Sequence, residues 1–212
     1  MRVIPFTYDT SDELISNTFV LVDNNNDCVV VDPGCLYQGI NNFIDKNGFT
    51  LKAVLLTHGH FDHIRGVDLL IEKHKVPLFI SFEDEEFLTN PLLNCSETFD
   101  GGRTVIKSKP TLVSDGDGIN VLSEKIKVIE TPFHTRGSVC YYLKDSQILF
   151  SGDTLFYHGI GRTDLPGAKP KELRHSMSKL AALPDEVKVY PGHGPFTSIS
   201  FERKTNPFVK IQ

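Results

Sequence analysis

A cluster of three histidines and one aspartate occupies residues 58–63. The segment reads Thr57-His58-Gly59-His60-Phe61-Asp62-His63 and directly follows an apolar run at residues 53–56. Imidazole nitrogens and carboxylate oxygens are common ligands of zinc and iron, and a small glycine lets the backbone turn so that the side chains converge. Structural zinc sites are usually closed by cysteines, whereas His/Asp sites keep a position for water and substrate. The spacing therefore predicts a catalytic metal site.

Further ligands are expected at the ends of three strands predicted downstream. His134 follows an apolar run at 126–130, Asp153 follows one at 147–150, and His193 follows one at 187–190. In each case a rigid strand positions the residue and the loop after it turns the side chain inward. Asp32 also follows a strand-like run, but it lies in a Pro-Gly turn. We expect it to support a ligand by hydrogen bonding and not to bind metal itself.

The other histidines are weaker candidates. His74 lies at the end of a predicted helix, where a cation suits the carbonyl-rich terminus, and we expect it to be solvated there. His175 is expected on the exposed face of another helix. His158 lies in the loop after Asp153 and is a secondary candidate for contact with substrate.

Apolar periodicity predicts two halves rich in strands and helices. The predicted strands of the first half lie at 19–22, 28–31, 53–56 and 76–80, and those of the second half at 119–122, 126–130, 139–144 and 147–151. Helices are expected at 36–44 with Gly48 past the end, from Val67, around Phe87 with Ser81 as its cap, and after Pro170. Residues 91–117 are polar and punctuated by Gly and Pro, which suits either a flap beside the site or a simple connection.

Composition narrows the class of protein. The chain has 212 residues, of which 40% are hydrophobic and 23% charged, enough to form one compact domain. A net charge of -5 with scattered basic residues disfavours nucleic-acid binding. The sequence has no apolar signal segment, no stretch long enough to span a membrane, and four cysteines without CxxC spacing. We therefore expect a cytoplasmic protein with reduced thiols, and the sequence makes no prediction of oligomeric state.

The order of these motifs resembles that of the metallo-β-lactamase fold superfamily, and within it the short glyoxalase II-like (hydroxyacylglutathione hydrolase-like) hydrolases. The similarity runs from Asn17 to Phe208 and includes residues 30–34, Val-Val-Asp-Pro-Gly, as the family's first motif. The resemblance implies an α/β fold, the αβ/βα sandwich of two mixed β-sheets flanked by helices. Residues 1–212 would form a single domain, without the separate C-terminal glutathione-binding domain of glyoxalase II, and the tail after Ser200 has room for only a short helix.

The resemblance also implies how the ligands divide between metals. One metal would be held by His58, His60 and His134, and the other by Asp62, His63 and His193, with Asp153 bridging the two. Two divalent cations are therefore expected, with zinc as the first choice and iron or manganese as alternatives. By this interpretation Asp62 is also catalytic, because it helps to orient a hydroxide that bridges the metals.

The implied reaction is hydrolysis of a small-molecule acyl thioester, such as a hydroxyacyl-thiol, by attack of the metal-bridging hydroxide. A thiolate with a pKa of roughly 8.5 leaves without a strong general acid, which suits such a site. Residues 159–166 resemble the family's substrate loop, where the planar guanidinium of Arg162 could bind a carboxylate such as that of glutathione. The plainer interpretation of Arg162 is an exposed loop charge paired with Asp164.

Two other functions were weighed against this one. A mono-iron persulfide dioxygenase of the same superfamily would use His58, His134 and Asp153 and would consume oxygen. Ile160 stands where that branch tends to carry cysteine, which counts against it. A metal-binding module without activity is disfavoured, because it would leave this open coordination without reactivity.

Overall fold

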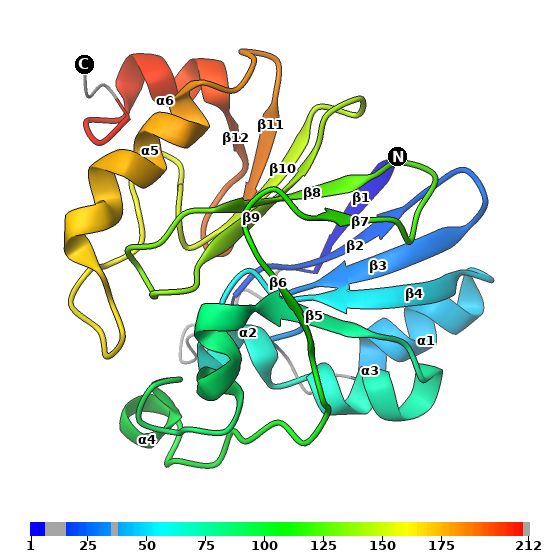
Figure 1. Cartoon of the computed structure of the whole chain (residues 1–212). Helices are drawn as coiled ribbons and strands as arrows, with labels where there is room; N and C mark the ends of the chain where they lie inside the picture. The colour runs from blue at the N-terminus through cyan, green and yellow to red at the C-terminus, as the bar shows by residue number, and fades with distance from the viewer. Residues whose placement is uncertain (7–15, 35–37, 210–212) are drawn as a thin grey trace.

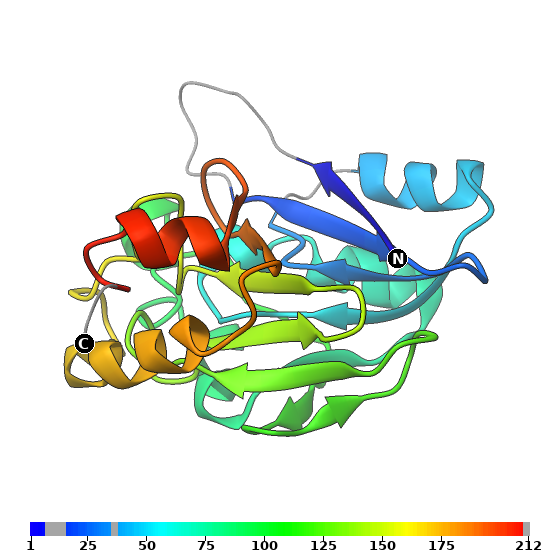
Figure 2. The same ribbon diagram turned by 90° about the horizontal axis from the view of Figure 1, so that it is seen from above.

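Two six-stranded β-sheets face each other in a computed structural model that describes residues 1–6, 16–34 and 38–209 (Figure 1). Helices cover the outer face of each sheet, so the layers run helix, sheet, sheet, helix (Figure 2). Both sheets contain parallel and antiparallel pairs. The αβ/βα sandwich predicted from the resemblance is confirmed.

The first sheet comes from the first half of the chain. Its strands lie in sequence order and are β1 (Arg2–Phe6), β2 (Thr18–Val22), β3 (Asp27–Val31), β4 (Thr50–Leu55), β5 (Leu78–Ser81) and β6 (Thr111–Val113). Strands β1 to β3 pair antiparallel and β3 to β6 pair parallel. The associated helices are α1 (Gln38–Lys46), α2 (Phe61–Ile64), α3 (Val67–His74), the 3-10 helix η1 (Phe82–Leu88) and α4 (Ser96–Phe99).

The second sheet comes from the second half and has the order β12-β11-β10-β9-β8-β7. Its strands are β7 (Gly118–Ile119), β8 (Ile126–Glu130), β9 (Val139–Leu143), β10 (Ile148–Gly152), β11 (Lys188–Pro191) and β12 (Thr197–Ser198). Only β10 and β11 pair parallel. The 3-10 helix η2 (Pro170–Glu172) leads into α5 (Leu173–Ala181), and α6 (Ile199–Thr205) completes the outer layer. No helix in the described ranges is long and apolar enough to cross a membrane.

Alternation along the strands divides the apolar side chains among three cores. In β2, Phe19 and Leu21 pack between the sheets, whereas Val20 and Val22 pack toward α1 and α3. In β9, Tyr141 lies in the core between the sheets, while Cys140 and Tyr142 pack with α5. Because these central strands are covered on both faces, every residue of β2 and β9 is buried. This explains why they appear in the sequence as continuous apolar runs.

The predicted elements agree with the structure except at short or irregular segments. Strands β1, β6 and β12 were not predicted, and the strand expected at 119–122 is wrong, because only Gly118–Ile119 pairs and the chain then bends. The helix capped by Ser81 is a 3-10 helix, with the Ser81 hydroxyl accepting the Glu83 N–H. Leu36, expected in the first helix, lies outside the described residues. Residues 91–117 contain α4 and β6, so they form more than a connection.

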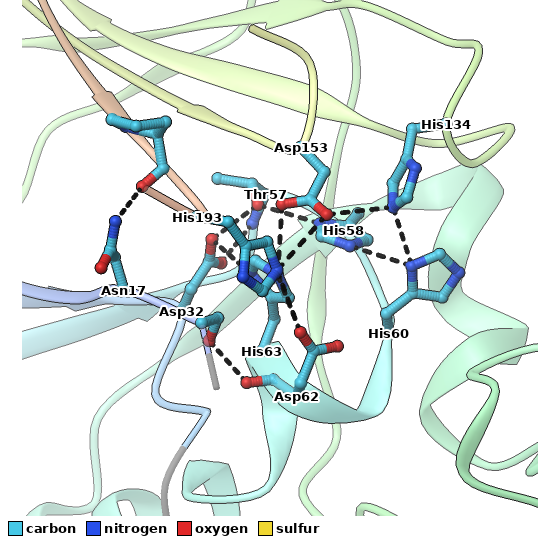
Figure 3. Close-up of polar contacts among 12 residues, drawn as sticks. Asn17, Asp32, Thr57, His58, His60, Asp62, His63, His134, Asp153 and His193 are labelled. Carbon is cyan, nitrogen blue, oxygen red and sulfur yellow. Dashed lines mark hydrogen bonds and ion pairs between the residues drawn. The ribbon is translucent and has the colours of Figure 1, made fainter. Parts of the chain in front are cut away.

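The strand directions bring the predicted site residues to one edge of the sandwich. In the first sheet β3 and β4 run parallel, and Asp32 and the 58–63 segment follow their carboxyl ends. In the second sheet β8, β10 and β11 share one direction, and His134, Asp153 and His193 follow their carboxyl ends. The two sheets therefore present their ligand loops to each other across this edge (Figure 3).

Candidate metal centre

Three histidine nitrogens converge at the first candidate position. His58 Nε2 lies 3.1 Å from His60 Nδ1, and His60 Nδ1 lies 2.9 Å from His134 Nε2. All three side chains are buried. His58 and His60 come from the loop after β4, and His134 comes from the loop after β8 in the other sheet (Figure 3).

Hydrogen bonds behind these rings fix which nitrogen carries a lone pair. His134 Nδ1 donates to the Arg162 carbonyl at 2.8 Å, so its Nε2 is an acceptor. The Thr57 hydroxyl donates to Asp32 at 2.6 Å, so it can only accept from His58 Nδ1, 3.2 Å away. His58 Nε2 is then also an acceptor. Two lone pairs therefore face His60 Nδ1, and a single proton there could satisfy only one of them.

Asp62, His63 and His193 form the second candidate position. His193 Nε2 lies 3.1 Å from Asp62 Oδ2, and His63 Nε2 lies 3.6 Å from the same oxygen. The opposite nitrogen of His63 is 3.0 Å from Asp32 Oδ2. This is the supporting contact expected of Asp32, whose second oxygen also accepts the Thr57 N–H at 2.8 Å.

Asp153 lies between the two positions. Its Oδ1 is 3.3 Å from His63 Nε2, and its Oδ2 is 3.3 Å from His134 Nε2 and 3.6 Å from His193 Nε2. The structure thus brings together all seven side chains predicted to bind metal, in overlapping groups. Asp153 thus contacts histidines of both positions.

The donor atoms fit divalent cations. His63 Nε2 and Asp153 Oδ1 are buried and lie 3.3 Å apart, and within the described part of the chain neither makes a well-formed hydrogen bond. Buried polar atoms almost always make a hydrogen bond. Buried nitrogen and oxygen atoms that make none, and whose lone pairs converge on one point, are typical of a metal site. Nitrogen and carboxylate donors suit zinc, iron or manganese.

The electrostatics of the two positions differ. Burial lowers the pKa of His60 to about 3 and that of His58 well below its usual range, so both rings are neutral at pH 7. For His63 burial acts the same way, but the carboxylates of Asp62 and Asp153 outweigh it and raise its pKa well above the usual value. Burial would raise the pKa of Asp153, yet the surrounding histidines hold it well below its ordinary value. The ionised carboxylates of Asp62 and Asp153 therefore stabilise positive charge at the second position.

Asp84 joins the loops that carry the ligands, and the sequence did not reveal it. Its fully buried carboxylate accepts the Gly59 N–H at 3.0 Å, the Thr135 hydroxyl at 2.7 Å and the Gly137 N–H at 2.8 Å. Burial raises its pKa to about 6, while these three donors lower it, so the group is ionised at pH 7. Gly59 lies between two predicted ligands and Thr135 follows a third. Asp84 thus links the two sheets' contributions to the first position.

Close backbone approach also holds the two halves together. Gly152 has a φ of +48°, and a Cβ there would lie 2.2 Å from Thr57 Oγ1. A Cβ on Gly192 would lie 2.2 Å from Asp153 Oδ1. Glycine is therefore required at both positions, because any side chain would push a ligand loop out of place.

A cavity of about 290 Å³ opens beside the metal ligands. His60, Asp62, His134, Asp153 and His193 line one side, and the remaining wall includes Phe61, Cys95, Phe99, Phe156, Arg162 and Leu165. The segment 91–117 thus reaches the cavity through Cys95 and Phe99. The Arg162 side chain is 55% exposed and makes two bonds to Asp164, from Nε to Oδ1 at 2.7 Å and from Nη2 to Oδ2 at 2.8 Å.

The other histidines lie away from this cavity. His158 is exposed and contacts the rings of Tyr157 and Phe201. His175 is exposed, as expected. The expectation of a solvated His74 is wrong: the ring is half-buried and its Nε2 lies 2.8 Å from Asn41 Oδ1, so it ties α3 to α1.

Comparison with known proteins assigns the fold to a family. Residues 11–193 match the model of the metallo-beta-lactamase superfamily, so the chain belongs to this superfamily. The probable metallo-hydrolase YqgX of Bacillus subtilis is 38% identical over 196 residues, covering 92% of each chain. The hydroxyacylglutathione hydrolase GloC of Haemophilus influenzae is 30% identical, covering 91% of this chain and 92% of its own.

Solved structures agree with this assignment. The B3 metallo-beta-lactamase BLEG-1 superposes with a TM-score of 0.86 at 36% identity, covering 92% of this chain and 94% of its own. TTHA1623 in a di-iron-bound form has a TM-score of 0.83 at 31% identity, covering 97% and 99%. ETHE1 from Myxococcus xanthus has a TM-score of 0.79 at 27% identity, covering 100% and 86%.

Proposed function

We propose that this protein is a binuclear metal-dependent hydrolase of small acyl thioesters. The observation that carries the proposal is the convergence of unpaired histidine and aspartate donors at two adjoining positions that share Asp153. His58, His60 and His134 would hold one cation, and Asp62, His63 and His193 the other. When bound, two such cations lower the pKa of a shared water to about 7 and polarise the carbonyl under attack.

The chain's own residues supply positioning. The Asp62 carboxylate lines the cavity and its Oδ2 lies 3.1 Å from His193 Nε2, so Asp62 would help to orient the attacking hydroxide by hydrogen bonding. Asp32 bonds the far nitrogen of the His63 ring, and Thr57, itself bonded to Asp32, contacts the far nitrogen of the His58 ring. These contacts keep the metal-facing nitrogens in their direction as charge develops. A thiolate with a pKa of roughly 8.5 departs without a dedicated acid. A relative that is a hydroxyacylglutathione hydrolase supports the thioester class.

We also propose that Arg162 contacts the substrate. Arg162 lines the cavity, and its main-chain carbonyl accepts a hydrogen bond from His134 Nδ1. Because Nε and Nη2 of the guanidinium already donate to Asp164, a substrate carboxylate would have to compete with Asp164 for the guanidinium. Its contribution to binding is therefore small unless that pair opens.

The test combines metal analysis with turnover. Protein purified without added metal or chelator is measured for metal by elemental analysis and then assayed with acyl thioesters, including lactoylglutathione. About two metals per chain and thiol release that is lost with chelator and restored by zinc, iron or manganese would support the proposal. A fully loaded protein that hydrolyses no thioester would refute it.

The mono-iron persulfide dioxygenase is retained as a second candidate, because His58, His134 and Asp153 also lie together around one position. One iron per chain and oxygen uptake with a persulfide substrate would favour it. Ile160 counts against it, because this side chain packs into the core beneath α5 and the chain offers no thiol at that point.

A further inference from the structure

Apart from the metal ligands, the residues that line the cavity are mostly apolar. Phe61 lies between the predicted ligands His60 and Asp62, and its ring stacks on Phe99 with centroids 6.3 Å apart and planes 17° from parallel. Phe156 and Leu165 line the same cavity. Phe156 also contacts the ring of His193 at 5.9 Å. Aromatic surface therefore lies directly beside the position where a substrate carbonyl would react.

This wall is built into the site and does not result from a chance exposed side chain. The Phe61 N–H donates to the Asn94 carbonyl at 2.9 Å, which ties the metal loop to the segment that carries Phe99. The buried Asn94 side chain in turn donates to the carbonyls of Phe87 and Thr104 and accepts the Ser96 N–H. Cys95, between Asn94 and Ser96, is held at a φ of +65°, which a non-glycine residue rarely adopts.

Charge in the cavity is confined to the ligands and one compensated pair. Apart from the predicted ligands, Arg162 is the one charged residue among the described residues that line the cavity, and Asp164 already neutralises it. A glutathione moiety carries two carboxylates and an ammonium group, and this wall offers them no further ionic partner. A volume of about 290 Å³ is at the small end of ligand pockets, which span about 300–1,000 Å³.

We propose that the ring of Phe99, positioned by its stacking on the buried Phe61, binds an apolar acyl group of the substrate, so that the preferred substrates are uncharged thioesters of aryl or branched-alkyl acids. The inference rests on the proposed thioester hydrolysis. Burial of apolar surface and edge or face contacts between rings supply the binding, and they act next to the reacting carbonyl. Phe99 is the residue that discriminates between acyl groups, because its ring is 46% exposed and can contact the substrate, whereas Phe61 is 4% exposed.

The test compares acyl groups on one uncharged thiol. The phenylacetyl and acetyl thioesters of N-acetylcysteamine are assayed with the metal-loaded protein, and each kcat/KM is divided by the rate of the same ester with free hydroxide. We expect at least about a tenfold preference for phenylacetyl, equivalent to about 1.4 kcal/mol. The same quotient, kcat/KM divided by the rate with free hydroxide, is expected to be lower for lactoylglutathione than for the phenylacetyl ester.

Variants locate the preference. Phe99→Ala should remove most of the preference for the phenylacetyl ester while leaving the metal content unchanged, and Phe99→Leu should retain most of it. Phe82→Ala is the matched control, because Phe82 is 61% exposed, against 46% for Phe99, and does not line the cavity. A preference that is absent, or that survives in Phe99→Ala, would overturn this inference and leave thioester hydrolysis standing. Failure of the loaded wild type on every thioester would overturn both.

Discussion

The ligand side and the substrate side of the cavity are built in different ways. Five of the seven predicted ligands are no more than 8% exposed, and each loop follows a strand end. The substrate side depends on the short helix α4 and the loop around Arg162, and the side chains of Phe99 and Arg162 are about half exposed. Hydrogen bonds to the buried carboxylates of Asp32 and Asp84 hold the first side. The buried amide of Asn94 and the stacking of Phe99 hold α4 on the second side, and a surface ion pair holds the Arg162 side chain.

This difference teaches where change is tolerated. A shift on the ligand side leaves buried donors unpaired, which costs about 1–3 kcal/mol for each group. A substitution on the substrate side exposes or removes a half-exposed side chain, so it lowers the free energy of unfolding much less. The reaction is thus determined by the sheets, and the choice of substrate by residues that vary more freely.

The largest effect is expected from Asp153→Asn. A neutral amide cannot bridge two cations, so thioester turnover should fall by more than the roughly 10- to 100-fold seen when only a supporting residue is lost. Metal content and kcat are the measurements. Asp164→Asn is the control, because it removes an exposed carboxylate from a neighbouring loop. Full activity with unchanged metal content in Asp153→Asn would refute the ligand assignment.

Metal removal should lower thermal stability through the ligand side. Each occupied site stabilises the fold by about 2.7 kcal/mol when free metal is 100 times its Kd. For a chain of this length, two sites correspond to a rise in Tm of about 10–20 °C over the chelated protein. Scanning calorimetry at fixed protein concentration measures this shift. Equal Tm values with and without metal would show that the ligand side needs no cation for its rigidity.

Asp84→Ala tests whether the link between the loops matters for the metals. The substitution leaves the Gly59 and Gly137 N–H groups without their acceptor, so metal affinity should fall about 10- to 100-fold. Competition with a chromophoric chelator measures the affinity. Glu85→Ala, an exposed residue of the same 3-10 helix, serves as the control. If both variants bound metal equally well, the ligand loops would hold their places without Asp84.

The smallest effect is expected at Arg162. With an acidic thioester as substrate, Arg162→Ala should raise KM by a few-fold at most, because exposed ion pairs contribute little, and change kcat less. Asp164→Asn frees the guanidinium and should lower KM for the same substrate. Steady-state kinetics on both variants separates the two interpretations. A KM that neither substitution changes would leave Arg162 as a surface charge only.

The sequence by itself determined much of the ligand side. The runs that end at Val31, Leu55 and Phe150 are apolar because both faces of their strands are covered, and the predicted site residues follow where those runs stop. The run that ends at Glu130 alternates instead, with Lys127 exposed, and His134 follows it. Short-range patterns of this kind depend on neighbouring residues, so they can be detected in the chain alone. Strands of two or three residues such as β12 and β6 were missed, because they form only by pairing with a neighbour.

Only the tertiary structure decided which distant groups meet. Ser81 and Asp84 have the spacing of a helix cap, and Ser81 acts as one, but Asp84 bonds Gly59 and Gly137, 25 and 53 residues away. The pairing of Phe61 with Phe99 likewise follows from the packing of α4 beside the metal loop. No local pattern encodes such contacts, because a buried carboxylate or a stacked ring depends on which surfaces the two sheets bring together.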